Sequence, residues 1–164
     1  MKKISLFLLI LGFATLTFAQ NQTTFILVRH AEKADDGTRN PPLNEEGKVR
    51  AANLADLLAN QEITALYSTP FKRTRETLQP LADSKSMEVT DYDPYAKEEW
   101  LAKLHEDHAG GTVVISGHSN TIPGLANLLL GSETFAQFDE AEYSNLIVIV
   151  GDRVGNGKLI RFSF

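Results

Sequence analysis

The sequence contains no cysteine, which excludes disulfide bonds. It is also short of positive charge, with 16 Lys and Arg against 21 Asp and Glu and a net charge of −5. Proteins that bind nucleic acid present a basic face to the phosphates, so this balance argues against a nucleic-acid partner. No internal repeat, low-complexity run or linker occurs, and the fold must rely on noncovalent packing.

The first nineteen residues differ in kind from the rest. Lys2 and Lys3 precede an apolar run over residues 4–18, and small residues before a cut after Ala19 are typical of a secretory signal peptide. An uncleaved anchor needs about 20 apolar residues, but this run is shorter and meets polar residues from Gln20 onward. We therefore expect export to the periplasm or the exterior, without stable membrane insertion after cleavage. Sequencing of the mature amino terminus, expected at Gln20, tests this.

Residues 20–164 are expected to form a single domain. Cleavage after Ala19 leaves 145 residues and removes Lys2 and Lys3 but no acidic residue, which takes the net charge from −5 to −7. A chain of this length can bury a sufficient core without covalent links.

Apolar runs and helical periodicities alternate along this domain. They predict strands at residues 24–28, 63–67, 87–89 and 112–115, and helices at residues 44–60, 70–82, 97–105 and 117–131. Two further apolar runs, at residues 145–150 and 159–164, flank an Asn-Gly pair that is typical of a β-hairpin. The pattern predicts an α/β fold with a mostly parallel sheet flanked by helices and a hairpin near one edge.

Helix-start signals accompany two of these segments. Asn44 is expected to cap the first helix, with Glu45 and Glu46 in the first turn. Thr69 is expected to cap the second helix, with Pro70 at its first position.

Polar segments follow three of the predicted strands, and the ends of parallel strands are where α/β proteins bind ligands. The first segment holds Arg29 and His30, the second holds Arg73, and the third holds His118. Four potential cations would then meet in one pocket of an otherwise acidic protein. Such a pocket fits the charge of a phosphate dianion, so a phosphate ester is the expected small-molecule ligand.

The same segments resemble four motifs of the histidine phosphatase (phosphoglycerate mutase-like) superfamily, in that superfamily's order. Arg29-His30-Ala31 resembles its Arg-His-Gly signature, and Pro42-Leu43-Asn44 through Gly47 resembles its Pro-Leu-Thr/Ser-x-x-Gly helix start. Further along the chain, Ser68 through Arg73 to Thr77 resembles its Ser-x-x-x-x-Arg-x-x-x-Thr segment, and Gly117-His118 resembles its second Gly-His. The resemblance implies a phosphoric monoester hydrolase of the histidine acid phosphatase type.

The resemblance further implies how the site residues act. His30 would be the nucleophile and would carry the phosphoryl group, while Arg29, Arg73 and a protonated His118 would hold the phosphoryl oxygens. Water would then release phosphate, with no metal or cofactor. His30 must enter the cycle neutral, because only an unprotonated ring nitrogen has a lone pair to attack phosphorus.

Two features depart from the superfamily's pattern. Ala31 stands where its signature has Gly, which adds a methyl group beside the nucleophile. The expected acidic proton donor is also not recognisable. Asp93, Glu98 and Glu99 are the candidates, and we favour Asp93 because it follows a short strand in a loop, whereas the other two fit a solvated helix face.

Two other functions remain open within this resemblance. A phosphoglycerate mutase-type phosphotransferase would use the same histidine, but its usual insertions are absent and export separates it from glycolytic substrates. A non-catalytic protein that binds a phosphorylated ligand would need the basic pocket alone, and the presence of His30 argues against it.

Two further patterns are set aside. Residues 105–108, His-Glu-Asp-His, lack the His-Glu-x-x-His spacing of a zinc helix and are interpreted as solvated polar residues, so no metal is expected. Ser119 lies in a Gly-His-Ser-Asn segment that lacks the second Gly of a hydrolase elbow, and no His follows His118.

Overall fold

A computed structural model describes residues 22–95 and 98–163, and the predicted signal peptide of residues 1–19 lies outside them. The strands are β1 (Thr23–Arg29), β2 (Ala65–Ser68), β3 (Val89–Asp91), β4 (Thr112–Gly117), β5 (Asn145–Gly151) and β6 (Lys158–Ser163). The helices are α1 (Glu45–Leu57), α2 (Lys72–Lys85), α3 (Glu98–Asp107) and α4 (Thr121–Leu130). In this part of the chain, no helix has the length and apolar character needed to cross a membrane.

The strands form one sheet in the order β3-β2-β4-β1-β5-β6. The four strands β3, β2, β4 and β1 are parallel to one another, as the alternation of strands and helices predicts. β5 pairs with β1 and β6 pairs with β5, both antiparallel. The predicted fold is confirmed, with the hairpin at one edge of the sheet.

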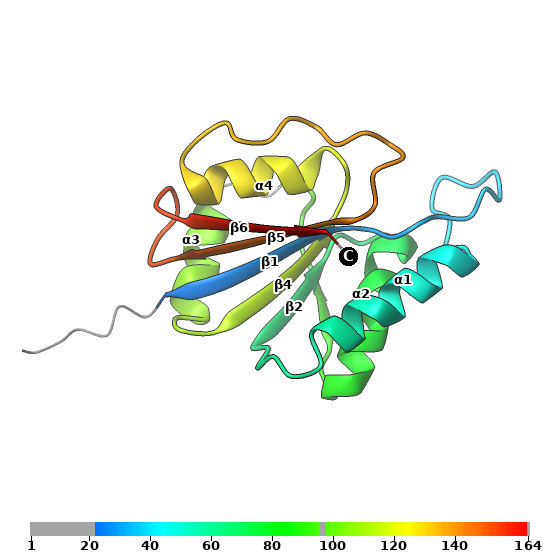
Figure 1. Cartoon of the computed structure of the whole chain (residues 1–164), viewed down its shortest axis with the longest axis horizontal. Coiled ribbons are helices and arrows are strands. Elements are labelled where there is room, and N and C mark those ends of the chain that lie inside the picture. The colour runs from blue at the N-terminus through cyan, green and yellow to red at the C-terminus, as the bar shows by residue number, and fades with distance from the viewer. Residues whose placement is uncertain (1–21, 96–97, 164) are drawn as a thin grey trace, which may run out of the picture.

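Helices cover both faces of the sheet, with α3 and α4 on one side and α1 and α2 on the other (Figure 1). The alternation of side chains along β1 builds both cores. Phe25 and Leu27 belong to the cluster that includes residues of α3 and α4, whereas Ile26 and Val28 belong to the cluster with α1 and α2. This explains why the strand is an unbroken apolar run.

The start of α1 agrees with the sequence, but the start of α2 does not. The Asn44 side chain accepts a hydrogen bond from the Gly47 N–H at 2.8 Å and caps α1 as expected. The predicted cap at Thr69 is wrong, because Phe71 is the residue before α2. The Thr69 hydroxyl instead contacts Thr74 and His118, so tertiary contacts use the group that was expected to cap the helix.

The third strand also begins later than predicted. Ser86 has φ 54° and ends α2 in the left-handed conformation. The Met87 N–H then donates to the Ala82 carbonyl at 2.9 Å, so Met87 still belongs to the end of the helix. β3 therefore runs over Val89–Asp91 rather than residues 87–89.

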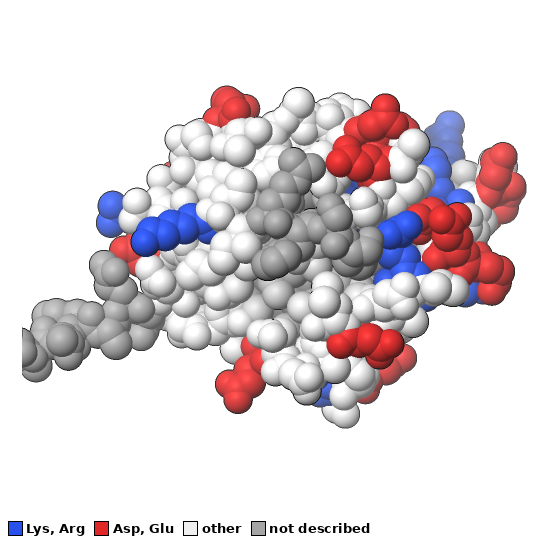
Figure 2. All heavy atoms as spheres, in the orientation of Figure 1, with Lys and Arg blue, Asp and Glu red and all other residues white. Residues whose placement is uncertain are grey.

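The carboxyl ends of the three central parallel strands lie level with one another. Arg29 is paired in register with Gly117, and Ser68 with Ser116. The loop over residues 131–144, which joins α4 to β5, reaches the same end of the sheet (Figure 1). Acidic side chains gather at that end, with Lys and Arg side chains among them (Figure 2).

Candidate active site

A cavity of about 340 Å³ opens at this end of the sheet. His30, Arg73 and His118 line it together, although they come from three separate segments of the chain. The ring centroids of His30 and His118 lie 5.5 Å apart. The cavity is lined by His30, Lys33, Phe71, Arg73, Pro94, Tyr95, His118, Ser119, Asn120, Thr121, Gln137 and Glu140.

His30 lies directly after β1 and is buried. Its Nδ1 is 2.8 Å from the Ala31 carbonyl oxygen, which can only accept, so Nδ1 carries the proton and Nε2 keeps its lone pair. Burial lowers the pKa of His30 to about 3, and the positive charges of Arg29 and Arg73 act in the same direction. The ring is therefore neutral at ordinary pH, as a nucleophilic nitrogen must be.

A chain of hydroxyl groups determines which ring nitrogen of His118 carries the proton. Thr74 Oγ1 lies 2.9 Å from both the Thr69 and Phe71 carbonyl oxygens and donates to them, so it accepts from Thr69 Oγ1 at 3.0 Å. Thr69 Oγ1 has then used its only proton and accepts from His118 Nε2, 3.0 Å away. His118 Nδ1 is left with a lone pair that faces the cavity residue Arg73 at 3.4 Å.

The electrostatic surroundings of His118 oppose its protonation. Burial lowers its pKa to about 4, and the charges of Arg73 and Arg29 contribute to this. The expected imidazolium is thus not the form that the protein alone favours. A phosphate dianion would supply the missing negative charge and raise the pKa of His118 again.

Arg73 projects from the first turn of α2 into the cavity. Its guanidinium carbon lies over the Phe71 ring, 4.7 Å from the ring centre, which is a favourable cation–π contact. Its Nε is buried and has no hydrogen-bond partner within the described residues. A buried donor without an acceptor is costly, so this atom points to an anionic ligand.

Arg29 is the most deeply buried of the four predicted cations, with 2% of its surface exposed. Nη1 donates to the carbonyl oxygens of Asp139 and Glu142 at 2.8 and 2.9 Å, and the guanidinium lies over the Tyr143 ring at 4.2 Å. Arg29 therefore anchors the loop before β5. It is not among the residues that line the cavity, and its buried Nε has no hydrogen-bond partner within the described residues.

Thr77 connects α2 to the residue that follows His30. Its hydroxyl accepts from the Ala31 N–H at 2.9 Å and donates to the Arg73 carbonyl at 2.7 Å. The methyl group of Ala31 is fully buried in a small cluster with Leu43 and Ala51. The departure from Gly is thus accommodated by packing beneath the loop.

Glu140 is the cavity residue that the sequence analysis missed. It is the one carboxylate among the twelve described residues that line the cavity. One oxygen accepts from Ser119 at 2.5 Å and the other from Arg29 Nη2 at 2.9 Å. The only sequence signal was an acidic residue in a loop.

None of the three predicted proton donors lines this cavity. The Asp93 carboxylate accepts the Tyr95 N–H at 2.8 Å, and its neighbours Pro94 and Tyr95 line the cavity in its place. Glu98 lines a different cavity, of about 360 Å³, beside α4, and Glu99 is exposed on α3.

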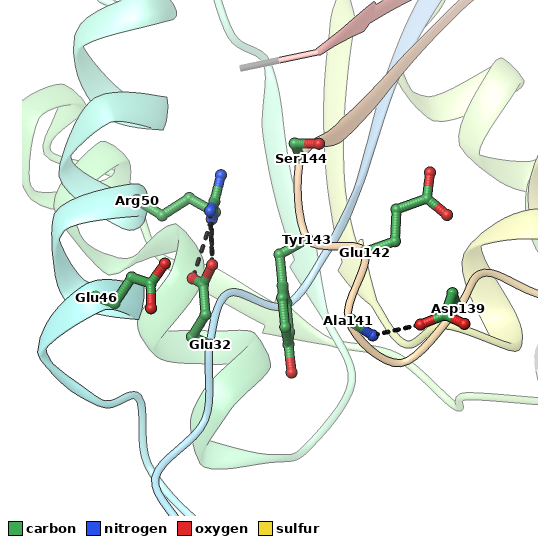
Figure 3. A pocket seen from close by; sticks show the side chains of 8 residues that line it. All are labelled: Glu32, Glu46, Arg50, Asp139, Ala141, Glu142, Tyr143 and Ser144. Atoms are coloured by element: carbon green, nitrogen blue, oxygen red, sulfur yellow. Dashed lines mark hydrogen bonds and ion pairs between the residues drawn. The ribbon is translucent and has the colours of Figure 1, made fainter.

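A second cavity, of about 650 Å³, is lined by Glu32, by residues of α1 and by residues of the loop over residues 131–144 (Figure 3). In this cavity the Glu32 carboxylate forms a bidentate ion pair with Arg50, with nitrogen-to-oxygen distances of 2.6 to 3.0 Å. Tyr143 lines this second cavity, and its ring centroid is 6.1 Å from that of His30. Its ring therefore lies beside His30 as well.

The segment from His105 to His108 differs from its interpretation as solvated polar residues. His105 is buried at 8% exposure, its ring packs edge-on against Phe25 at 4.8 Å, and neither ring nitrogen has a partner within the described chain. His108 Nε2 is 3.1 Å from the Tyr67 hydroxyl. In the part of the chain that the structure describes, no three His, Asp or Glu side chains are grouped so that they could hold a metal ion.

Two histidines and Arg73 line the first cavity, and the buried Arg29 lies at the end of the neighbouring strand β1, so positive and hydrogen-bonding groups are concentrated at this end of the sheet. The family model of the histidine phosphatase superfamily (branch 1) matches residues 25–94, which include the first His and both Arg residues of the site. Over this stretch the chain is similar to the histidine phosphatase superfamily.

Part of the chain is also similar in sequence to a protein with a named activity. Phosphoserine phosphatase 1 of Hydrogenobacter thermophilus is 39% identical over 74 residues, which cover 42% of this chain and 35% of that protein. The chain thus matches about a third of the length of this relative.

Solved structures share the fold over nearly their whole length. The protein histidine phosphatase SixA complexed with tungstate has a TM-score of 0.72 at 21% identity and covers 85% of this chain and 96% of its own. A phosphohistidine phosphatase SixA from Agrobacterium tumefaciens has a TM-score of 0.62 at 23% identity, with 86% and 98% covered. A mycobacterial glucosyl-3-phosphoglycerate phosphatase has a TM-score of 0.69 at 13% identity, with 87% and 98% covered.

Proposed function

We propose that this protein is a metal-independent phosphatase that hydrolyses a phosphomonoester through a phosphohistidine at His30. The observation that carries the proposal is the state of the His30 ring. Its Nδ1 is held by the Ala31 carbonyl and its pKa is lowered to about 3, which leaves a neutral ring with the Nε2 lone pair available. The match to the histidine phosphatase superfamily over residues 25–94 and the similarity to a phosphoserine phosphatase support the same reaction.

Two half-reactions follow from this geometry. In the first, His30 Nε2 forms a bond to phosphorus while the bond from phosphorus to the leaving oxygen breaks, and the leaving oxygen takes a proton. In the second, a water oxygen bonds to phosphorus, the phosphorus–nitrogen bond breaks and its electron pair returns to His30. The sum is an alcohol and inorganic phosphate.

The positive groups around the nucleophile would balance the phosphoryl charge without a metal. Arg73 and Arg29 each keep a buried Nε without a partner among the described residues, and such donors are strong ligands for phosphoryl oxygens. Once an anion raises the pKa of His118, its Nδ1 gains a proton and becomes a further donor. These three groups act where charge develops in the transition state.

The proposal is tested by trapping the intermediate. The parent protein, mixed with nitrophenyl phosphate and quenched in base, is expected to carry an acid-labile, base-stable phosphoryl group, whereas His30→Ala is expected to carry none and to lose turnover. Chelators are expected to leave the parent activity intact, and vanadate to inhibit it as a five-coordinate mimic.

His108→Ala serves as the matched control, because His108 lies outside the cavity and contacts Tyr67. Full turnover by His30→Ala would refute the phosphohistidine. Loss of activity on chelation, restored by a divalent ion, would refute metal independence alone.

A further inference from the structure

Glu140 combines two properties that are usually opposed, namely a fixed carboxylate and an accessible one. Both oxygens are held, one by Ser119 at 2.5 Å and the other by Arg29 at 2.9 Å. Nevertheless 68% of the side-chain surface is exposed, against 1% for Arg29. A ligand in the cavity can therefore reach this carboxylate while protein groups keep it in place.

The groups that hold Glu140 lie at or just after the ends of two central strands. Arg29 ends β1, and Ser119 follows β4 directly after His118. The loop that carries Glu140 is itself fixed, because Arg29 Nη1 binds the carbonyl oxygens on both sides of it, at Asp139 and Glu142. The carboxylate is thus positioned against the same strand ends as the two histidines.

We propose that Glu140 is the group that transfers the proton at this site, and that Ser119 and Arg29 position it. This inference rests on the proposed phosphatase function and supplies the acid that the reaction needs. No other carboxylate lines the cavity in the part of the chain that the structure describes. Asp93, the candidate from the sequence, holds the Tyr95 N–H instead.

One carboxyl group can carry out both proton transfers of the catalytic cycle. As the bond from phosphorus to the leaving oxygen breaks, protonated Glu140 gives its proton to that oxygen and becomes a carboxylate. When water attacks the phosphohistidine, the carboxylate takes one proton from the water and returns to its acid form. Each turnover thus begins and ends with the same protonation state.

The charge of the substrate would favour the acid form of Glu140. In the protein alone, the hydrogen bond from Ser119 lowers the pKa of Glu140, and Arg29 and Lys33 act in the same direction. A phosphate dianion beside His30 adds negative charge to the cavity and competes for Arg29. Both effects raise the pKa of Glu140 when the proton is needed.

The experiment measures the first half-reaction alone, as the rate of phosphohistidine formation in a single turnover. An alkyl phosphate needs a proton on its leaving oxygen, whereas nitrophenyl phosphate releases a stable phenolate. Glu140→Gln keeps the side-chain shape but cannot donate this proton. It is expected to slow phosphorylation by the alkyl phosphate about 100-fold or more, and by nitrophenyl phosphate less than about tenfold.

Asp93→Asn and Glu99→Gln are the controls, and both are expected to form the phosphohistidine from each substrate at the rate of the parent protein. Equal losses with both substrates in Glu140→Gln, or no loss, would overturn the proton-transfer role. A selective loss in Asp93→Asn instead would restore the sequence candidate. A parent protein that forms no phosphohistidine with either substrate would defeat the proposed function and this inference together.

Ser119→Ala gives a second test that leaves the carboxylate present. Without the Ser119 hydrogen bond the pKa of Glu140 rises, so the pH above which alkyl phosphate hydrolysis declines is expected to move upward. Nitrophenyl phosphate hydrolysis is expected to show no such movement. If the pH dependence of alkyl phosphate hydrolysis does not move in Ser119→Ala, the assignment of Glu140 as the proton donor is contradicted, even if Glu140→Gln fails to fold.

Discussion

At the scale of single residues, the orientation of His118 depends on one hydroxyl group. Thr69 Oγ1 accepts from His118 Nε2 at 3.0 Å because its own proton is donated to Thr74. This contact turns the Nδ1 atom of His118 toward Arg73 and the cavity. The residue that the sequence suggested as a helix cap is therefore a positioning residue for the site.

Thr69→Val tests this role, because valine keeps the shape and removes the acceptor. We expect kcat/KM for nitrophenyl phosphate to fall about tenfold, near the net worth of one buried hydrogen bond. The loss is expected in kcat more than in KM, and the pH dependence of kcat is expected to shift because His118 loses its fixed tautomer. Steady-state kinetics between pH 5 and 8 measure both.

Thr90→Val is the matched control, since Thr90 is an exposed residue of the neighbouring strand β3. Unchanged kinetics in Thr69→Val would show that the hydroxyl chain does not position His118.

At the scale of elements, the start of α1 is hydrogen-bonded to the loop after His30. The Glu32 carbonyl accepts the Asn44 N–H at 2.9 Å, so the helix start lies directly against the segment that follows His30. A Cβ atom on Gly47 would lie 2.2 Å from the Glu32 oxygen, which is backbone and cannot move alone. Gly47 is thus required for close approach rather than for an unusual backbone angle.

Gly47→Ala is expected to push α1 away from this loop. The free energy of unfolding should fall by about 1 to 3 kcal/mol, the usual cost of overpacking, and kcat/KM should fall because the loop carries His30. Urea denaturation and steady-state kinetics measure the two effects.

Gly124→Ala provides the contrast within the same fold. Gly124 lies in the first half of α4 and no atom approaches its missing Cβ within 4 Å. Alanine there should raise the free energy of unfolding by about 0.5 to 1 kcal/mol through helix propensity. Equal effects of the two substitutions would contradict the close-approach argument.

At the scale of the whole molecule, buried histidines tie stability to pH. Burial lowers the pKa of His30 to about 3, that of His118 to about 4, and that of His105 below its ordinary value of 6.5. Below pH 6.5 the unfolded chain binds protons that the folded protein excludes. The contribution of the neutral histidines to the free energy of unfolding is therefore complete above pH 6.5. The free energy of unfolding declines as the pH falls from 6.5 toward 4.

His105 allows this to be tested away from the active site. Because neither ring nitrogen of His105 has a partner within the described residues, His105→Leu is expected to raise the free energy of unfolding by about 1 kcal/mol at pH 7. The gain is expected to grow as the pH falls from 7 to 5, since leucine cannot be protonated. Urea denaturation at several pH values measures it.

His108→Leu is the control, because it removes the contact between His108 Nε2 and the Tyr67 hydroxyl. This variant is expected to be less stable than the parent at pH 7. A gain in His105→Leu that does not change with pH would contradict the proposed titration.

Local signals in the sequence were sufficient for much of this molecule. The apolar run of β1, the Asn44 cap and the stop at Gly131, whose φ is 69°, depend on neighbours a few residues away and are confirmed. The order of strands and helices likewise led to the mostly parallel sheet. The parallel sheet then brings Arg29, His30 and His118 to one end, because motifs that follow its strands share an edge.

Tertiary structure alone decided how the site is completed. Glu140 meets Arg29 across 111 residues of sequence, and Thr69 meets His118 across 49. Asp93 has the same chemistry as Glu140 but is turned to its own loop, and His105 is buried although its segment is polar. Contacts of this kind depend on the path of loops and on the packing of layers, which short-range preferences and spacing do not encode.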